Sequence, residues 1–256
     1  MFATGSMSFN NLLLRRRKLS HGLACAVALA TVFAAAPASS HPEVTLFQPC
    51  LFQGRGCFAR RPPASRRGLP VLLVLRLKVV ADKLTEIELV ATRSSAEGLI
   101  FNIDGLSAPS EVMNYAPRPE QLATRDEAIK AALHYPEGLN AAKTFADVNA
   151  PFAADAYRYE NGQVMAGPDC KFAAGCQNIS TQSLAIFNRL GDVQTRVIAV
   201  DERMGIVWLR MAWGVRERGG DQLTVWETFK VYDGKIHAVE AFMKILPVEK
   251  RNGGWE

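Results

Sequence analysis

The sequence lacks the short motifs of several large enzyme classes. It has no GxGxxG segment or P-loop, which cradle nucleotide phosphates, and no HExxH or GxSxG segment of zinc proteases and serine hydrolases. It has only four histidines, and two of them, His21 and His41, lie near the amino terminus. We therefore predict neither a metal site nor a cofactor. Cofactor-free proton transfer and simple binding remain as function classes.

Acidic residues are scarce at the start of the chain. Residues 1–81 hold eleven Lys and Arg against one acid, Glu43, for a net charge of +10, whereas residues 82–256 carry −5. The chain has 256 residues and is 48% hydrophobic, which suffices for one or two globular domains with a buried core. Because the globular part is acidic, we expect no nucleic-acid partner.

Long hydrophobic runs are also missing, since the apolar stretch at residues 22–36 is shorter than the roughly 20 residues that span a bilayer. This stretch follows a positive cluster at 15–18 and precedes small residues at Ala36 and Ala38. That order is typical of a secretory signal peptide, although an N-terminal membrane anchor is the alternative. We predict a signal peptide over 1–38, a secreted or periplasmic protein, and no membrane contact after cleavage.

Of the five cysteines, four lie outside that apolar stretch and form two close pairs, Cys50 with Cys57 and Cys170 with Cys176. No histidine lies near either pair and neither has the Cys-x-x-Cys spacing, which argues against zinc. In an oxidising compartment each pair could close a small disulfide loop. We predict the Cys170–Cys176 disulfide. For Cys50 and Cys57, which lie in an irregular stretch, disulfide and free thiols both stay open.

An internal repeat is visible at a constant offset of 152 residues. Residues 71–80 and 84–91 are predicted to form a β-hairpin, because they are apolar, rich in β-branched residues and free of proline. Residues 225–232 and 236–243 flank the turn Asp233-Gly234, a strong hairpin signal. The matching pairs are Lys78 with Lys230, Val79 with Val231, Lys83 with Lys235, Leu84 with Ile236, Ile87 with Val239, and Glu88 with Glu240.

The second half of the chain is predicted to begin with helices and end in a long antiparallel sheet. Thr124 and Glu127 form a capping box for a helix over 125–134, which Pro136 and Gly138 should end. Further predictions are a helical stretch at 139–148, an extended piece at 156–160, a turn at Asn161-Gly162, a loop over 163–180, a weak helix at 181–189, and strands at 193–200, 205–215, 222–232 and 236–245. This order defines the α+β class.

Five pieces carry a resemblance to a known superfamily: LRLKVVADKLTEIELVATR at 75–93, YRYENG at 157–162, the loop around Cys170, VIAVDERMGIV at 197–207 and FKVYDGKIHAVEAFM at 229–243. In this order, together with the predicted helices, they resemble the nuclear-transport-factor-2-like cone fold, which includes SnoaL-like proteins and ketosteroid isomerases. More narrowly, the chain resembles secreted proteins with two such cones in tandem. The resemblance implies a cone-shaped, curved antiparallel sheet wrapped around N-terminal helices, a pocket between them, and a homodimer formed through the sheet.

The first copy of the repeat is incomplete, because no room precedes its hairpin for a helical half. We therefore divide the chain into a signal peptide, an irregular basic segment at 39–70, a partial first cone unit with a linker at 71–115, and a complete cone at 116–256. The basic segment is either a linker or the product of a shifted reading frame that replaces the rest of the first cone.

Chemistry is expected inside the cone, where an ionisable residue would alternate with apolar residues along one of the last strands. Glu227 alternates with Val225 and Phe229, and Glu240 alternates with Ala238 and Phe242. A carboxylate desolvated there would have a raised pKa and could act as a general base. The alternative is that these faces are solvated. The further candidates are His237 as a base, and Tyr157, Trp208 and Arg210 as ligand-binding residues.

Three functions stay open at this point. The first is binding of a small apolar or aromatic molecule in the cone. The second is a cofactor-independent isomerase, lyase or hydratase that uses Glu227, Glu240 or His237 as its base, by analogy with the superfamily. The third is an interaction module that dimerises through its sheet.

Overall fold

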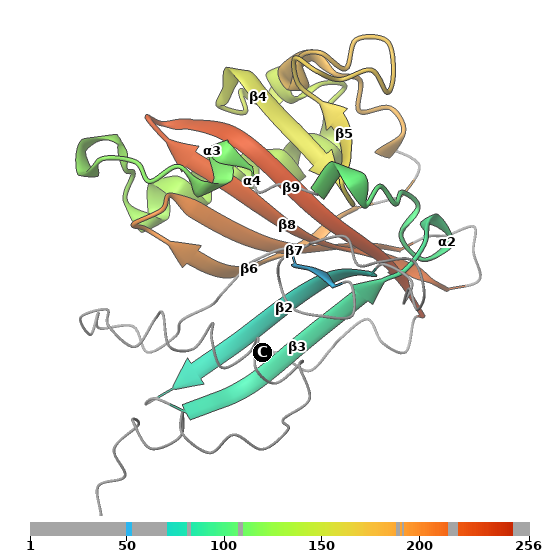
Figure 1. Cartoon of the computed structure of the whole chain (residues 1–256). Coiled ribbons are helices and arrows are strands. Elements are labelled where there is room, and N and C mark those ends of the chain that lie inside the picture. Colours follow the sequence, from blue (N-terminus) through green and yellow to red (C-terminus); the bar gives the residue numbers. More distant parts are fainter. Residues whose placement is uncertain are drawn as a thin grey trace, which may run out of the picture.

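A computed structural model describes the arrangement of this chain (Figure 1). The described residues are 50–52, 71–80, 83–106, 110–187, 190, 192–214 and 220–247. The predicted signal peptide lies outside them, and so does Cys57, so the structure does not bear on a Cys50–Cys57 disulfide. Within the described residues the architecture is α+β, as predicted, with a long curved sheet and few helices.

The main sheet has six strands in the order β5-β4-β9-β8-β7-β6. Neighbouring strands are antiparallel except β4 and β9, which are parallel, so the prediction of a fully antiparallel sheet is corrected at this pair. The strands predicted at the carboxyl-terminal end are confirmed to within two residues. The bounds are β4 Phe152–Glu160, β5 Gln163–Ala166, β6 Gln194–Asp201, β7 Ile206–Gly214, β8 Gln222–Tyr232 and β9 Lys235–Leu246.

Strand β5 corrects the prediction of a loop that starts at residue 163. The turn Asn161-Gly162 before it is present as predicted, and both of its residues have positive φ, 44° and 83°. Such a turn matches the twist of two antiparallel strands and brings the following residues back alongside β4. Gln163 therefore pairs with Glu160, and Val164 with Tyr159.

The long helix is α4, Arg125–Ala141, and its predicted capping box is present. The Thr124 hydroxyl accepts a hydrogen bond from the Glu127 backbone N–H. The helix runs through Pro136 and Gly138, so the prediction that they end it is wrong. Both residues are buried, and a side chain on Gly138 would lie 2.7 Å from the Phe145 ring. Packing against the sheet therefore outweighs the local cost of proline and glycine within a helix.

The other helical elements are short. After α4 the chain forms a 3₁₀ turn, η4, in place of the second helical stretch predicted up to Val148, and η5 overlaps the first residue of the weak helix predicted at 181–189. The elements are α2 Ser95–Gly98, η2 Asp104–Leu106, α3 Glu111–Asn114, η3 Pro119–Gln121, η4 Phe145–Val148 and η5 Ile179–Thr181.

Helix α4 covers one face of the six-stranded sheet, which we call the inner face. The aromatic rings between them are in contact: the centroid of Tyr135 lies 4.6 Å from that of Phe145 and 5.2 Å from that of Phe229. Phe145 in turn lies 5.4 Å from Phe152. These rings belong to the larger apolar core of the described residues. Aromatic side chains therefore make much of the contact between helix and sheet.

The second sheet consists of β1 Cys50–Phe52, β2 Val71–Val80 and β3 Lys83–Thr92. The strand β1 corrects the prediction that 39–70 is irregular throughout, whereas the β2–β3 hairpin is present as predicted. Its register repeats that of β8–β9 at the offset of 152: a β-bulge follows Lys78 in one hairpin and Lys230 in the other. The two hairpins thus share pairing as well as sequence, and the tandem-cone interpretation stays a prediction.

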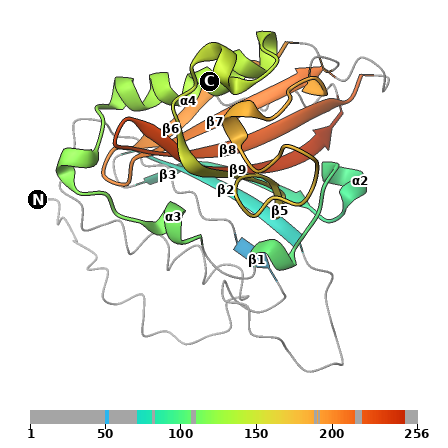
Figure 2. The ribbon, with the colours of Figure 1, turned by 90° about the horizontal axis from the view of Figure 1, so that it is seen from above.

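The β2–β3 hairpin packs on the outer face, which is the face of the main sheet opposite α4 (Figure 2). An apolar cluster joins them: Val74 from the hairpin and Ile198, Trp208, Trp226 and Phe242 from the main sheet. Polar contacts fix one end of the hairpin, since the Thr92 hydroxyl donates to the Met243 carbonyl at 3.0 Å. The hairpin therefore occupies part of the sheet face through which we predicted dimerisation.

Residues after the hairpin are held to the main sheet by two buried polar side chains. Asn161 Nδ2 donates to the carbonyl oxygens of Gly98, Ile100 and Met243, and its Oδ1 accepts from the Met243 N–H. On the outer face, Lys230 Nζ donates to three backbone carbonyls, those of Met113, Tyr115 and Met204. Burial lowers the pKa of Lys230 to about 8, against the opposing charge of Asp201.

We expect Lys230→Met to lower the free energy of unfolding at pH 7 by about 1–3 kcal/mol, because three carbonyls lose a donor. Between about pH 8 and the unfolded pKa of 10.5 the unfolded chain binds the proton and the folded chain does not, so Lys230 makes stability rise with pH there. Lys230→Met should remove this rise in urea denaturation. Lys78→Met is the control, since Lys78 pairs with Glu86 nearer the surface and should contribute under about 1 kcal/mol.

Candidate functional site

A cluster of polar side chains lies on the inner face of the sheet, within the aromatic core. Arg158 is at its centre: its Nε lies 3.0 Å from Glu160 Oε1, Nη1 donates to the Tyr135 hydroxyl at 3.3 Å, and Nη2 donates to Gln182 Oε1 at 2.9 Å. Glu227 completes the cluster through a hydrogen bond with Tyr135. Arg158, Glu227 and Tyr135 are each only 2% exposed. We call these five residues the inner polar cluster.

Strand alternation explains why these side chains meet. Along β4, Ala156, Arg158 and Glu160 are buried on the inner face. Along β8, Glu227 lies between Val225 and Phe229, which both belong to the inner core. Helix α4 supplies the Tyr135 ring from the opposite side. Three separate elements therefore place acid, base and hydroxyl groups in one apolar compartment.

Burial sets the protonation of the cluster. It raises the pKa of Glu227 to about 8, and the negative charge of Glu160 adds to the shift, whereas Arg158 and the hydrogen bond to Tyr135 oppose it. Burial raises the pKa of the Tyr135 hydroxyl as well. At neutral pH the cluster therefore holds an Arg158–Glu160 ion pair beside a protonated Glu227. That carboxyl group can donate one proton, and its conjugate base can accept one.

Glu240 lies on the outer face, so the sheet separates it from Glu227. Its Oε1 accepts a hydrogen bond from the Tyr157 hydroxyl at 2.9 Å, and that hydroxyl is also hydrogen-bonded to Ser110. Burial raises the pKa of Glu240, and hydrogen bonds from Tyr157 and Ser110 oppose the shift. The expectation that both glutamates face one interior is therefore corrected. The Tyr157 side chain also lies on the outer face. Because the sheet lies between them, the carboxylates of Glu227 and Glu240 cannot contact the same small molecule.

The other predicted site residues also lie away from the inner polar cluster. His237 stacks on Tyr232, with ring centroids 3.6 Å apart, and burial lowers its pKa. Trp208 lies in the apolar cluster beneath the hairpin. On that same face the Arg210 guanidinium lies 5.5 Å from the Trp226 ring centroid. Burial lowers the pKa of Arg210, and the charge of Glu88 in the hairpin opposes this shift.

Sequence analysis missed four members of the inner polar cluster: Tyr135, Arg158, Glu160 and Gln182. The signal for two of them was present, because Arg158 and Glu160 alternate with tyrosines in YRYENG just as Glu227 alternates with apolar residues. In this segment the sequence analysis predicts Tyr157, and neither Arg158 nor Glu160, as a ligand-binding residue. Gln182 carried no local signal, since the loop that bears it meets β4 only in the folded chain.

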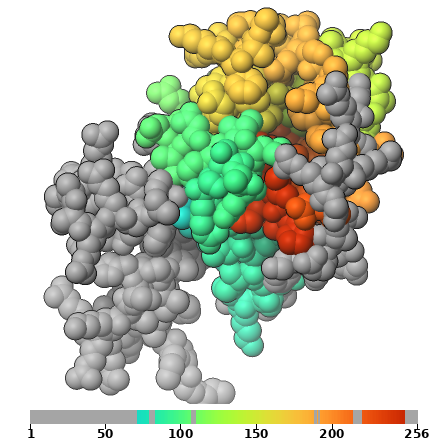
Figure 3. Space-filling model, turned by 90° about the vertical axis from the view of Figure 1, so that its right-hand side faces the viewer, coloured from blue at the N-terminus to red at the C-terminus, as the bar shows by residue number. Residues whose placement is uncertain are grey.

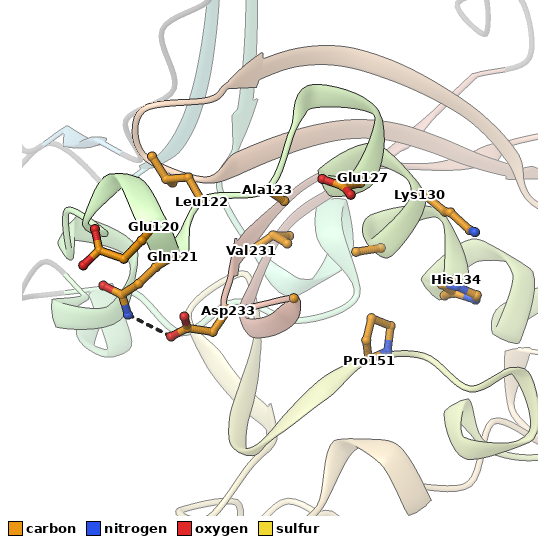
Figure 4. Close-up of a pocket in the computed structure, with 12 residues that line it drawn as sticks. Glu120, Gln121, Leu122, Ala123, Glu127, Lys130, His134, Pro151, Val231 and Asp233 are labelled. Atoms are coloured by element: carbon orange, nitrogen blue, oxygen red, sulfur yellow. Dashed lines mark hydrogen bonds between the residues drawn. The ribbon is translucent and has the colours of Figure 1, made fainter.

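The structure also has a surface hollow of about 450 Å³ at the start of α4, beside the β8–β9 turn (Figure 4). Its rim carries charges of both signs, and Gln121 donates to Asp233 across one end at 2.8 Å. Its lining includes Glu120, Glu127, Lys130, His134, Pro151 and Val231. None of the predicted site residues lines this hollow, and its open, mixed-charge rim differs from the apolar interior around Glu227.

The predicted Cys170–Cys176 disulfide is present, with the two Cα atoms 5.7 Å apart. Across the described ranges, no three His, Cys, Asp or Glu side chains converge in a way that could hold a metal ion. In those same ranges no helix is long and apolar enough to cross a membrane.

Residues 121–243 match a family model described as "Domain of unknown function (DUF8021)". This range runs from the last residue of η3 to β9 and includes every member of the inner polar cluster. The comparison with curated proteins found no match.

Several solved structures are similar over about half of the chain. A de novo designed protein with a curved β-sheet has 15% identity and a TM-score of 0.36, and the match covers 51% of this chain and 93% of that one. A putative SnoaL-like polyketide cyclase from Jannaschia sp. CCS1 has 14% identity and a TM-score of 0.31, covering 51% and 91%. An epoxide hydrolase of the LEH-like type from M. tuberculosis has 18% identity and a TM-score of 0.30, covering 49% and 86%.

The described residues form a curved sheet with α4 packed on its inner face, which agrees with the α+β cone architecture predicted from the sequence. The class of protein is therefore an α+β cone-fold protein with a charged cluster buried in its interior. Proteins described as SnoaL-like and as NTF2-like are among the similar structures.

Proposed function

We propose that this protein, after export, binds a small apolar or aromatic molecule in the interior of its cone. The observation that supports this most directly is the inner polar cluster, a few hydrogen-bonding groups set in an otherwise aromatic compartment. Small-molecule sites have this composition, and strongly shifted pKa values gather at functional sites. Export rests on the order of residues in the predicted signal peptide and agrees with the Cys170–Cys176 disulfide.

In this proposal the aromatic rings of the inner face hold the apolar part of the ligand. The protonated Glu227 donates a hydrogen bond to a ligand carbonyl or hydroxyl oxygen. Arg158 can bind a negatively charged group of the ligand in place of Gln182. Entry requires movement of the segment 182–187. It covers the cluster through Gln182 and through Phe187, whose ring centroid lies 5.9 Å from the Arg158 guanidinium.

The pKa of Glu227 supports a second candidate, cofactor-independent proton transfer. A carboxyl group with a pKa of about 8 can act both as acid and as base near neutral pH. A bound molecule with an acidic C–H bond or a leaving hydroxyl would then be isomerised, hydrated or cleaved. In this case Tyr135 and Arg158 hold Glu227 in position and stabilise its charged form.

The test is mass spectrometry of the purified mature protein after incubation with a metabolite extract. We expect the wild type to retain a small molecule and Glu227→Leu, which has no hydrogen-bond donor, to lose about 90% of it, since a ten-fold change corresponds to about 1.4 kcal/mol, within the range for one hydrogen bond. Glu240→Leu is the matched control, because it makes the same change on the outer face, and it should retain the molecule fully.

The same assay decides between binding and catalysis. A product that forms with the wild type and with Glu240→Gln, but not with a folded Glu227→Gln, would support proton transfer. Equal retention by the wild type, Glu227→Leu and Glu240→Leu would place the ligand elsewhere and contradict the assignment to the inner polar cluster. If no molecule is bound or converted, the proposal fails and the interaction module becomes the better hypothesis.

A further inference from the structure

The loop between β5 and β6 contains the one Asn-x-Ser/Thr triplet of the whole sequence, Asn178-Ile179-Ser180. Such a triplet, with any residue but proline in the middle, is the acceptor sequence of N-linked glycosylation. Because the triplet also arises by chance, its place in the fold and its compartment decide whether it can be used.

The fold presents this triplet at the surface. Asn178 and its neighbour Gln177 are exposed, whereas Ile179 is 2% exposed and anchors the segment in the apolar core. Asn178 precedes η5 in an extended conformation, and its Oδ1 accepts a hydrogen bond from the Ser180 N–H at 2.9 Å. The yellow-to-orange loop that holds these residues forms the upper surface in Figure 3. A bulky group on Asn178 can therefore be accommodated without unfolding the core.

The disulfide in the same loop indicates the compartment. Cys176 lies two residues before Asn178 and is bonded to Cys170, and Gln177 Nε2 donates to the Cys170 carbonyl at 2.8 Å. Disulfides form and persist in oxidising compartments, which include the lumen of the endoplasmic reticulum, where N-glycosylation takes place. The disulfide and the triplet are independent features, and both fit passage through a eukaryotic secretory pathway.

We infer that Asn178 is a site of N-linked glycosylation; this inference rests on the export part of the proposed function. The donor is an oligosaccharide linked to a lipid diphosphate. A bond forms between Asn178 Nδ2 and C1 of the first sugar, and the bond from C1 to the diphosphate oxygen breaks. The amide proton passes to a base of the transferase, and the lipid diphosphate leaves. No electrons are exchanged with an oxidant or a reductant.

The glycan would stand on a loop that carries exposed apolar side chains. Phe172 is 56% exposed within the disulfide loop, and Ile186, eight residues beyond Asn178, is 68% exposed. A hydrophilic glycan on such a loop raises solubility, since exposed apolar groups favour association. Asn178 takes no part in the inner polar cluster, so glycosylation and ligand binding are separable.

The experiment is expression of the full chain in a eukaryotic secretory host such as yeast, followed by intact-mass measurement and peptide mapping of the secreted protein. We expect one N-linked glycan on Asn178, removable by a glycosidase that converts the asparagine to aspartate. Asn178→Gln and Ser180→Ala should abolish the modification. Ser180→Thr is the matched control, because it keeps the hydroxyl that the acceptor sequence requires, and it should stay glycosylated.

A secreted protein with a closed Cys170–Cys176 disulfide and an unmodified Asn178 would overturn this inference and leave the proposed ligand binding untouched. Retention of the unglycosylated chain inside the host would overturn it as well, because the export on which it rests would fail. The ligand test uses the mass of bound molecules instead of the mass of the chain. Failure of one proposal is therefore distinguishable from failure of the other.

Discussion

Glu227→Gln is expected to stabilise the protein progressively, relative to the wild type, as the pH rises from about 5 to 8.5. Burial raises the pKa of Glu227 from the ordinary glutamate value of 4.5 to about 8 in the fold. Between these values the folded chain keeps the proton and the unfolded chain has released it, so the wild type loses stability as the pH rises. Each pH unit between the two pKa values corresponds to about 1.36 kcal/mol, so the loss is on the order of a few kcal/mol.

Urea denaturation of both proteins at pH 5 and pH 8.5 measures this effect. The glutamine cannot ionise, so the advantage of Glu227→Gln over the wild type should be larger at pH 8.5. Glu240→Gln should also gain at the higher pH, since burial raises the pKa of Glu240 too, and the double variant should combine the two gains because the sheet separates the sites. An advantage of Glu227→Gln that does not change with pH would mean that Glu227 is charged in the fold at neutral pH, against our description.

Val74→Asp should detach the β2–β3 hairpin from the main sheet. Val74 is 4% exposed and packs among Trp208, Trp226 and Phe242. A carboxylate in that apolar cluster must be desolvated, a cost on the order of 3 kcal/mol or more. Because the hairpin can move away and leave the charge in water, we expect a local opening in which the α4-covered core stays folded.

Tryptophan fluorescence and dye binding report this opening. The emission of Trp208 and Trp226 should shift to longer wavelengths in Val74→Asp, with more binding of a hydrophobic dye and little change in far-ultraviolet circular dichroism. Leu89→Asp is the matched control: Leu89 is on β3 but 59% exposed, so its effect should stay within about 0.5 kcal/mol. Equal effects of the two variants would show that Val74 does not anchor the hairpin to the main sheet.

Opening of the hairpin would also test the predicted dimer. The freed outer face would expose the two tryptophans and Phe242, an apolar patch that favours association. If the homodimer forms through this face, Val74→Asp should increase the dimer fraction in analytical ultracentrifugation. A dimer of the wild type that is insensitive to Val74→Asp would place the dimer contact outside the part of the face that the hairpin covers.

Several elements of the fold follow from local sequence. Strands β6 to β9 and the β2–β3 hairpin were predicted because β-branched and aromatic residues fill them and short turns separate them. The capping box at Thr124 and the turn at Asn161-Gly162 depend only on residues a few positions apart. The Cys170–Cys176 disulfide was predictable for the same reason. Such features can be predicted without knowing which residues pack against them.

Other elements were decided by contacts between distant residues. Helix α4 continues through Pro136 because its far end, at Gly138, packs closely against Phe145 and completes the inner core. The parallel pairing of β4 with β9 brings together residues about 80 positions apart, such as Tyr159 and Glu240. Local propensity carries no information about either contact.

The candidate site, too, depends partly on local sequence and partly on contacts between distant residues. The residue pattern shows that β8 alternates Glu227 with Val225 and Phe229 and that β9 carries Glu240 in a similar pattern. It did not determine which face of these strands lies inside the cone. Both faces of β8 are apolar because both are covered, the inner one by α4 and the outer one by the hairpin and the residues that follow it. Only the tertiary structure placed Glu227 beside Arg158 and Glu240 on the other side of the sheet.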